Sequence, residues 1–268
     1  MDLHEVSLRV RSRLRAEACR LLWRTRARDS EEARRLRQKE LWYRGIPEEL
    51  EWWRDWLPTE EGSAWLSDVL NPERPIQDHV VARLLAEIPD DPVSIIEVGS
   101  GPITHLGYTH PAKTVRITPV DPLAEEYAAL LRRQGIRPPV WPVKGDGESL
   151  LGPFARQSFD LAWASNALDH CYDPLLVIRN LLALVKPGRS VVLRHYRNEG
   201  RHAHYEGMHQ WNFDIQDGDL VIGTEAEEHN VSALLQGEAR VESFLEDSRA
   251  FGAFEHNQWV VSVATRLE

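Results

Sequence analysis

The sequence predicts an α/β fold with a doubly wound, mostly parallel sheet, preceded by a helical extension. From about residue 76 onward, short runs rich in β-branched residues alternate with longer helical runs, as parallel strands joined by crossover helices require. Before that point, apolar residues recur three and four positions apart, which is typical of amphipathic helices. We therefore expect a helical extension or lid over residues 1–75 and an α/β domain over residues 76–268.

Composition restricts the class of protein further. The chain has 268 residues, of which 42% are hydrophobic and 28% charged, as in soluble globular proteins. No window approaches the roughly 18 uninterrupted apolar residues of a transmembrane helix, and charges interrupt the apolar N-terminal residues. We therefore expect no signal peptide and a cytoplasmic location. Cys19 and Cys171 are the only cysteines, too few for a disulfide framework or a thiolate metal site.

The charge is distributed unevenly along the chain. Residues 1–45 have a net charge of +6, and the remainder has a net charge of −16. A basic helix can bind RNA or an anionic membrane, but the acidic body would repel polyphosphate. We therefore expect the arm to dock on its own protein or on a second subunit, as in a homodimer, and we expect neither a membrane nor a nucleic acid as the main partner.

The extension is expected to hold one helical stretch over residues 6–43 and a second over residues 47–70. Ser30, followed by two glutamates, is typical of a helix cap and predicts a restart within the first stretch. The second stretch carries four of the ten tryptophans, namely Trp52, Trp53, Trp56 and Trp65. Such a density of indole rings favours packing against another surface, as core or lid, over a cofactor site.

The elements expected after the extension follow a regular order. They are “VSIIEV”, “TVRITPVD”, the helical “LAEEYAALLRRQG”, “PPVWPVKGD”, “FDLAWA”, the helical “LLVIRNLLALVKPG” and “SVVLRHY”. The near-continuous apolar strands indicate burial on both faces. In the tail, “FDIQDGDLVIG” has an Asp-Gly turn between two strands, and “ARVESFLEDS” with “NQWVVSVATRL” is expected to close the sheet as an antiparallel pair.

The run “IIEVGSGPIT” ends a strand in a glycine turn, which is a common way to hold a nucleotide cofactor. A dinucleotide fingerprint fails here, because Thr104 stands where the third glycine should be. The turn is also expected to bind a phosphate weakly, since Pro102 has no N–H group to donate and Glu97 adds a negative charge. S-adenosylmethionine carries a sulfonium and an ammonium, which a carboxylate attracts, while Gly99 and Gly101 let the backbone approach the ligand.

Polar residues at the ends of the second, third and fourth predicted strands can contact the same cofactor. Asp121 closes a strand twenty positions after Gly101, where its carboxylate can accept from both ribose hydroxyls, although this alone would suit NAD equally. Asp146 follows the third strand and can accept from the adenine amine, with the Gly147 N–H near a ring nitrogen. The fourth strand ends at Ser165 and Asn166.

Taken together, residues 76–268 resemble a class I S-adenosylmethionine-dependent methyltransferase. The resemblance rests on five segments in the family's order: “IIEVGSGP”, Asp121, “GDGESL”, “NALDHCYDP” and “LLALVKPGRSVVL”. It implies a Rossmann-like seven-stranded sheet whose last strand is antiparallel, with the cofactor bound across strands one to four. Three positions depart from the family pattern: Ile103 and Arg189 replace glycines and Gly147 replaces an alanine.

The cofactor site predicted in this way consists of residues from four strand ends. They are Glu97, Gly99, Ser100, Gly101, Asp121, Pro122, Asp146, Gly147, Ser165 and Asn166.

Methyl transfer to a hydroxyl requires removal of a proton, and histidine is the natural base near neutral pH. We expect His170 or His209 to be that base, with Asp169, beside His170, either orienting its imidazole or packing as a helix cap. The alternative is that His170 only shapes the methionine pocket. A carboxylate acceptor would need no base, which would leave both histidines with positioning roles.

The acceptor is expected to lie against the insertion that follows the fifth strand and against the loop after the first glycine turn. The residues assigned to this wall are His105, Tyr108, His110, His195, Tyr205, Trp211 and Asn212. The three loop residues can equally cap a helix. A metal site made by His202, His204 and His209 is set aside, because no carboxylate follows at a convincing spacing, so we expect no metal.

The sequence thus predicts a methyltransferase for a small-molecule, glycan or peptide natural-product acceptor, acting on a hydroxyl or carboxylate oxygen. One alternative is an RNA methyltransferase that uses the Arg-rich arm. A second alternative is a methyltransferase-like protein without catalysis that serves as an assembly partner.

Overall fold

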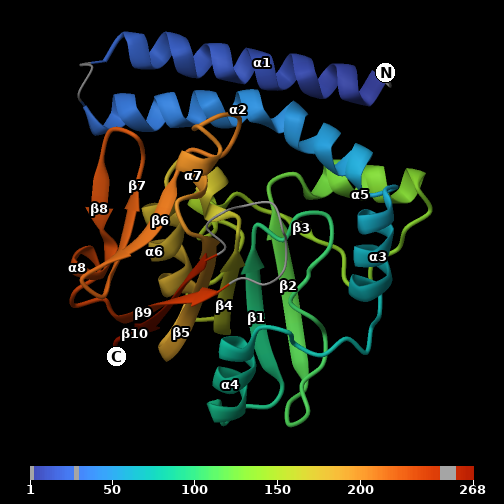
Figure 1. Cartoon of the computed structure of the whole chain (residues 1–268), viewed down its shortest axis with the longest axis vertical. Coiled ribbons are helices and arrows are strands. Elements are labelled where there is room, and N and C mark those ends of the chain that lie inside the picture. The colour runs from blue at the N-terminus through green and yellow to red at the C-terminus, as the bar shows by residue number, and fades with distance from the viewer. Residues whose placement is uncertain (1–2, 27–29, 248–257) are drawn as a thin grey trace.

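A seven-stranded sheet forms the centre of the molecule (Figure 1). The computed structural model describes residues 3–26, 30–247 and 258–268. The strand order is β3-β2-β1-β4-β5-β10-β9, in which β1 to β5 are parallel and β10 is antiparallel to both neighbours. The bounds are β1 Val93–Val98, β2 Val115–Asp121, β3 Val143–Lys144, β4 Phe159–Ser165, β5 Val185–Tyr196, β9 Ala239–Asp247 and β10 Gln258–Arg266. The predicted doubly wound sheet and its antiparallel closing pair are confirmed.

Helices cover the sheet and one of its ends. The helices are α1 Leu3–Arg24, α2 Glu31–Trp56, α3 Glu60–Val69, α4 His79–Glu87, α5 Ala124–Arg133, α6 Pro174–Leu184, α7 Glu199–His202 and α8 Val231–Leu234. Two short 3₁₀ turns, η1 Gly147–Ser149 and η2 Leu168–His170, follow β3 and β4. None of these helices is both long and apolar enough to cross a bilayer.

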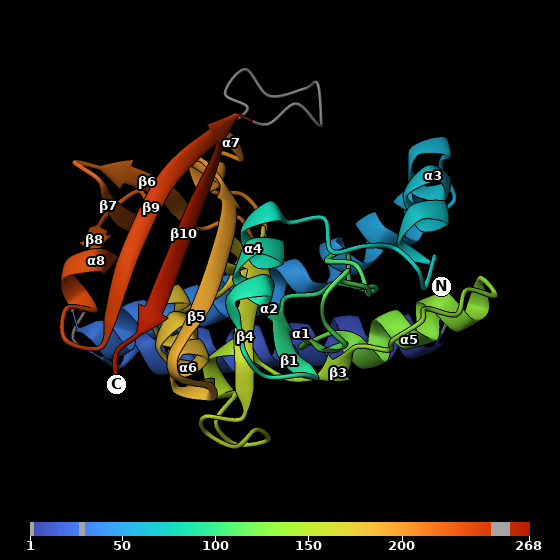
Figure 2. The same ribbon diagram turned by 90° about the horizontal axis from the view of Figure 1, so that it is seen from below.

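Different helices cover the two faces of the sheet. Helix α4 lies against one face of the sheet (Figure 2). There, Val81 and Leu85 of α4 pack with Ile95 of β1 and its neighbours. On the other face, Ile178 and Leu181 of α6 pack among the strand residues of the larger apolar cluster. This two-sided burial explains the near-continuous apolar strands, and it leaves only the strand ends free to carry polar chemistry.

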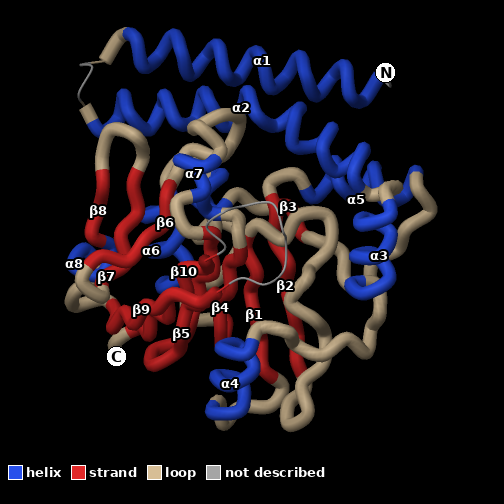
Figure 3. The backbone as a smooth tube through the Cα atoms, in the orientation of Figure 1, coloured by secondary structure: helices blue, strands red, loops and turns tan. Residues whose placement is uncertain are grey.

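The insertion after β5 folds as a separate three-stranded sheet beside the main one (Figure 3). It consists of β6 Asn212–Gln216, β7 Asp219–Gly223 and β8 Glu228–Asn230. Asp217 and Gly218 both have positive φ, as the two-residue hairpin predicted from the Asp-Gly pair requires. Phe213 and Ile222 are buried in the main apolar cluster, so the insertion is firmly attached to the sheet.

The N-terminal helices lie across the carboxyl ends of the strands. Ser30 caps α2 by accepting from the Ala33 N–H, which confirms the predicted restart. The prediction that a new helix begins at Pro47 is wrong, because α2 continues through it and bends along its second half (Figure 1). Proline removes only one helical hydrogen bond, and α2 is anchored by Ile46 and its neighbours, which pack against Tyr127 of α5. The domain boundary near residue 75 stays a prediction.

The connection between β1 and β2 differs from the one expected. Residues 99–114, all of them described, form a loop with no helix for His105, Tyr108 or His110 to cap, so that expectation is wrong. The covering helix of this face, α4, comes before β1 instead. Gly107 has φ +103°, and a Cβ there would collide with the Pro75 carbonyl, so this glycine lets the loop press against the chain that leads into α4.

We predict that Gly107→Ala destabilises the protein more than Gly135→Ala does. Gly135 also has positive φ, but a Cβ there meets nothing within 4 Å. The Gly135→Ala variant therefore reports the cost of backbone strain without a steric collision. The expected loss of unfolding free energy is about 1 kcal/mol for Gly135→Ala and at least about 2 kcal/mol for Gly107→Ala. Urea denaturation of both variants tests this, and equal losses would show that the close approach at Pro75 is unimportant.

Candidate functional site

The glycine turn after β1 lies between the end of β4 and α2. Gly99 and Gly101 have φ of +72° and +63°, a conformation that favours glycine. A Cβ on Gly99 would collide with Ala167, and a Cβ on Gly101 would lie 3.3 Å from the Trp53 ring of α2. The turn therefore has little space for side chains at these two positions, and the Trp53 indole of the N-terminal extension covers it.

Two buried carboxylates flank this turn. Neither oxygen of Glu97 has a hydrogen bond of good geometry among the described residues. Burial raises the pKa of its carboxyl to about 8, although nearby Thr104 and the His105 backbone oppose the rise. Asp121 accepts from the Gly101 N–H at 3.0 Å and from the Leu123 N–H at 2.8 Å. Burial nevertheless raises the pKa of Asp121 to about 7. The positive charge of Arg74 opposes the rise in the pKa of Glu97 without cancelling it, whereas the charges that act on Asp121 are the negative ones of Glu49 and Glu126. A cationic ligand would stabilise the ionised forms of both carboxylates.

The turns after β3 and β4 complete the strand-end surface. Asp146 caps η1 by accepting from the Glu148 N–H, and it also accepts from the Tyr172 hydroxyl. A Cβ on Gly147 would lie 3.0 Å from a side-chain methyl group of Val177 of α6, a tight contact that favours glycine at this position. Asn166 has φ +45° and directly follows β4. Ser165 ends β4, while Ser100 and Pro122 lie in the turns after β1 and β2, so the structure brings all ten predicted cofactor residues to one edge.

The three predicted catalytic residues form one cluster beside this edge. His209 Nδ1 lies 2.7 Å from Asp169 Oδ2 and 3.1 Å from His170 Nε2. His170 Nε2 lies 3.4 Å from the same Asp169 oxygen. The Asp169 side chain is fully buried, whereas the side chains of His170 and His209 are 22% and 34% exposed. The histidines therefore form the open side of the cluster and the carboxylate forms its floor.

Charge is strongly coupled within the cluster. Burial opposes ionisation of Asp169, but the positive charges of His170 and His209 outweigh it and hold the pKa of the carboxyl below its usual range. Burial likewise opposes the charge on His209, but Asp169 outweighs it and raises the pKa of the imidazole. Glu199 Oε1 lies 3.9 Å from His209 Nδ1. The cluster thus holds a permanent carboxylate beside nitrogen atoms that can carry a proton or a cation.

The residues predicted to line the acceptor wall are not all brought together. Tyr108 donates to the Val69 carbonyl, and the His110 ring contacts the Ala82 carbonyl of α4, so both fasten the 99–114 loop. His105 stacks edge-on against Trp163. His195 is buried, stacks on Phe213, and has no hydrogen-bond partner for either ring nitrogen among the described residues.

The remaining wall residues hold the insertion loop in shape. Asn212 donates to the Tyr205 hydroxyl at 2.9 Å, and the Trp211 indole donates to the Cys171 carbonyl at 2.7 Å. Trp211 thereby ties the insertion to the segment after β4 and brings His209 beside Asp169. An acceptor-binding role for the seven wall residues stays a prediction, and His202 and His204 do not join His209 in its cluster.

A carboxylate supplied by the N-terminal extension, Glu49, is not among the predicted site residues. Glu49 of α2 accepts from the Trp53 indole at 2.9 Å and from the Tyr127 hydroxyl at 3.3 Å. Its negative charge adds to the burial that raises the pKa of Asp121, and it adds to the larger effect of Asp169 on the pKa of His209, so Glu49 acts on the charge of both groups. No sequence signal marks Glu49, since an acid on an amphipathic helix usually faces solvent.

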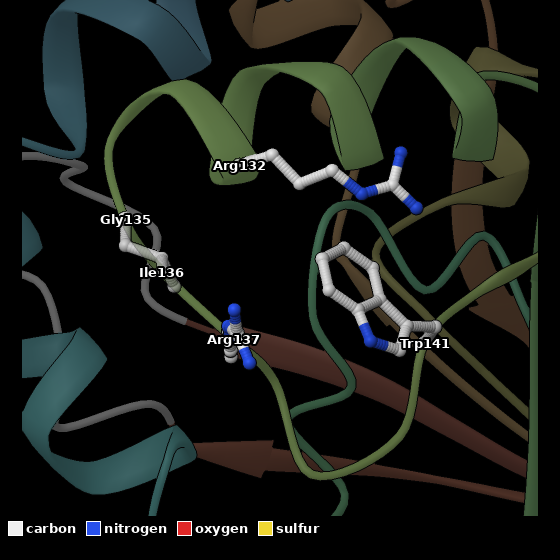
Figure 4. Close-up of a pocket in the computed structure, with 5 residues that line it drawn as sticks. All are labelled: Arg132, Gly135, Ile136, Arg137 and Trp141. Carbon is white, nitrogen blue, oxygen red and sulfur yellow. The ribbon is translucent and has the colours of Figure 1, made fainter.

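A pocket of about 450 Å³ lies elsewhere, at the end of α5 (Figure 4). Its lining residues are Arg132, Gly135, Ile136, Arg137 and Trp141. The Arg132 guanidinium lies 4.9 Å from the Trp141 ring centre, as a cation–π pair. None of the five is an acid or a histidine, so this pocket holds no group suited to proton transfer.

Comparisons with known proteins agree with the geometry. Residues 96–193 match the family described as “Methyltransferase domain”. A methyltransferase of Haloferax volcanii, solved in complex with the Trm112 methyltransferase activator, has a TM-score of 0.50 at 16% identity, over 81% of this chain and 98% of that one. At this identity the likeness concerns the fold.

Two further structures are similar at lower scores. One is a SAM-dependent methyltransferase from Aquifex aeolicus, with a TM-score of 0.44 and 12% identity over 75% of this chain and 92% of that one. The other is the 1,6-didemethyltoxoflavin-N1-methyltransferase of Burkholderia thailandensis, with a TM-score of 0.44 and 15% identity over 81% and 87%. Among curated proteins, none matches the chain.

Proposed function

Since the chain belongs to the class I S-adenosylmethionine-dependent methyltransferases, we propose that it methylates an oxygen atom of a small-molecule, glycan or peptide natural-product acceptor. The observation that carries this proposal is the Asp169–His170–His209 cluster, which lies at the same sheet edge as the cofactor turn. Nitrogen nucleophiles with a free lone pair need no such cluster, whereas a hydroxyl must lose a proton.

The cofactor side of the site fits S-adenosylmethionine. When bound, this cofactor supplies a methyl group on a positively charged sulfur atom. Glu97 presents two buried oxygens without partners to a cationic group, and Asp121 retains lone pairs for ribose hydroxyls after accepting two backbone N–H groups. Gly99 and Gly101 leave the backbone bare where the ligand must approach.

On the acceptor side, we assign removal of the hydroxyl proton to Asp169, His170 and His209. Asp169 is buried and ionised, so it orients His209 and stabilises positive charge beside it. The two imidazoles face the open side, where a hydroxyl group can reach them. A carboxylate acceptor would use the same residues only for positioning.

We further propose that the N-terminal helices act as a lid over this site in the cytoplasm, and not as an RNA-binding arm. Arg9 of α1 pairs with Glu51 of α2, and Arg35 of α2 lies 3.5 Å from the Asp173 carboxylate. Positive side chains of the arm are thus neutralised within the same chain. This pairing leaves less charge to attract a polyphosphate.

Calorimetry with S-adenosylmethionine tests the cofactor assignment. We expect Asp121→Ala to weaken binding about 10- to 100-fold, because hydrogen bonds to a charged group contribute about 1.5–3 kcal/mol. Asp55→Ala is the matched control, since Asp55 is fully exposed on α2, and it is expected to bind like the wild type. Absence of binding by the wild type would refute the enzyme proposal, and equal effects of the two variants would show that the pocket is misplaced.

Binding of the cofactor is also expected to strengthen as the pH rises from 6 to 9. Asp121 and Glu97 are protonated and neutral below their pKa values of about 7 and 8, and each gains its charge as the pH passes that value. The ionised forms attract the cationic ligand. Glu97→Gln should remove the part of the rise near pH 8, and an unchanged pH profile in that variant would contradict the role of Glu97.

Transfer of a labelled methyl group to a panel of glycosides, phenols and peptide acids tests the acceptor class. We expect label in methyl ethers or esters, and we expect Asp169→Asn to slow transfer to a hydroxyl at least about 100-fold while cofactor affinity stays unchanged. Asp217→Asn, in the exposed hairpin turn, is the control and should be fully active. Label found only on nitrogen would contradict oxygen transfer.

A further inference from the structure

Three potential metal-ligand atoms converge in the histidine cluster. Asp169 Oδ2, His170 Nε2 and His209 Nδ1 are separated pairwise by 2.7, 3.1 and 3.4 Å. Ligands at about 2.1 Å from a metal ion lie about 3.0 Å apart at right angles and about 3.4 Å apart at tetrahedral angles. In the part of the chain that the structure describes, this is the one group of three or more such residues whose ligand atoms meet in this way.

Hydrogen bonds to Asp169 leave the short contact between the two imidazoles unexplained. If both imidazoles donate to Asp169 Oδ2, their two N–H groups face each other with the nitrogen atoms only 3.1 Å apart. If His209 Nδ1 carries its proton toward Asp169, it has no lone pair to accept from His170. If His209 Nδ1 instead accepts from His170, its lone pair faces a carboxylate oxygen at 2.7 Å, which is repulsive. A single cation that receives a lone pair from each of the three atoms satisfies all contacts at once.

Buried polar atoms around the cluster give a second, independent observation. Asp169 Oδ1 is buried without a hydrogen-bond partner, and the same holds for both ring nitrogens of His195. Buried polar groups of this kind are rare in proteins and usually indicate a missing partner. Glu199, 15% exposed at its side chain, offers a further carboxylate 3.9 Å from His209 Nδ1.

We propose that Asp169, His170 and His209 bind one divalent transition-metal ion, with zinc or manganese as the class that two imidazoles and a carboxylate favour. Magnesium and calcium prefer all-oxygen sites and should bind more weakly. The exposed sides of the two histidines leave positions open for a ligand from solution. Asp169, fixed in the floor, provides the charge that holds the ion.

This inference rests on the proposed function and says how the cluster acts on the acceptor. A divalent ion lowers the pKa of a hydroxyl that it contacts, so the proton leaves to solvent. The oxygen then forms a bond to the methyl carbon, and the carbon–sulfur bond breaks with its electron pair going to sulfur. The products are a methyl ether, a neutral thioether and one proton. The positive charge of the sulfonium thus leaves with the proton.

Direct metal binding tests the site without an acceptor. Chelator-treated full-length protein would be titrated with Zn²⁺, Mn²⁺ and Mg²⁺ by calorimetry, with bound metal counted by elemental analysis. We expect one Zn²⁺ or Mn²⁺ per chain and Mg²⁺ binding at least 10-fold weaker. His170→Ala and His209→Ala should weaken binding about 100-fold or more. His79→Ala, an exposed histidine on α4, is the matched control and should bind like the wild type.

The outcomes separate this proposal from the proposed function. Cofactor affinity measured on the same variants shows that they are folded, and bound Co²⁺ should give absorption bands that disappear in His209→Ala. The metal site is overturned if the wild type binds no metal, or if His209→Ala binds it as tightly as His79→Ala does. In that case methyl transfer by chelator-treated protein would still support the enzyme, with His209 as a direct base. Failure of the proposed function itself would show as absent cofactor binding.

Discussion

The site depends on one electrostatic constraint, the burial of an ionised Asp169 beneath two imidazoles. An unpaired buried carboxylate costs several kcal/mol, so its charge must be balanced by groups brought from elsewhere in the chain. His170 comes from the same 3₁₀ turn, but His209 comes from the insertion forty positions later. The backbone bond from the Gln210 N–H to the Asp169 carbonyl, at 3.1 Å, fixes the two segments together. The insertion therefore contributes directly to the site by placing His209 beside Asp169.

Much of the architecture could be predicted because it follows from local patterns. Buried parallel strands produce continuous apolar runs, which can be recognised in the sequence. The turn after β1 can be recognised as well, because its positive φ angles favour glycine. The same holds for the Ser30 cap and the Asp217–Gly218 hairpin. Adjacency in the sequence also predicts that Asp169 lies near His170, and their side chains are 3.4 Å apart, but the shorter contact to His209 depends on the fold of the insertion.

What could not be predicted is set by contacts between distant segments. Pro47 alone indicates a helix boundary, but packing of α2 on Tyr127 overrides it. The role of Gly147 depends on Val177, and that of Gly107 on Pro75, and neither partner is identifiable from one sequence. Glu49 is the clearest case, because only the placement of α2 over the strand ends turns an ordinary helical acid into a neighbour of Asp121 and His209.

Helix α2 contacts two separate parts of the candidate site, and this has a consequence for how ligands can enter. Trp53 lies against Gly101 at the cofactor turn, while Gly45 lies so close to Met208 of the insertion loop that a Cβ would collide there. One continuous helix therefore touches the places where two different ligands must enter. A displacement of α2 large enough to uncover the glycine turn would therefore also remove Gly45 from Met208, two residues from Gln210 and next to His209, so that access to the two ligand sites would change together.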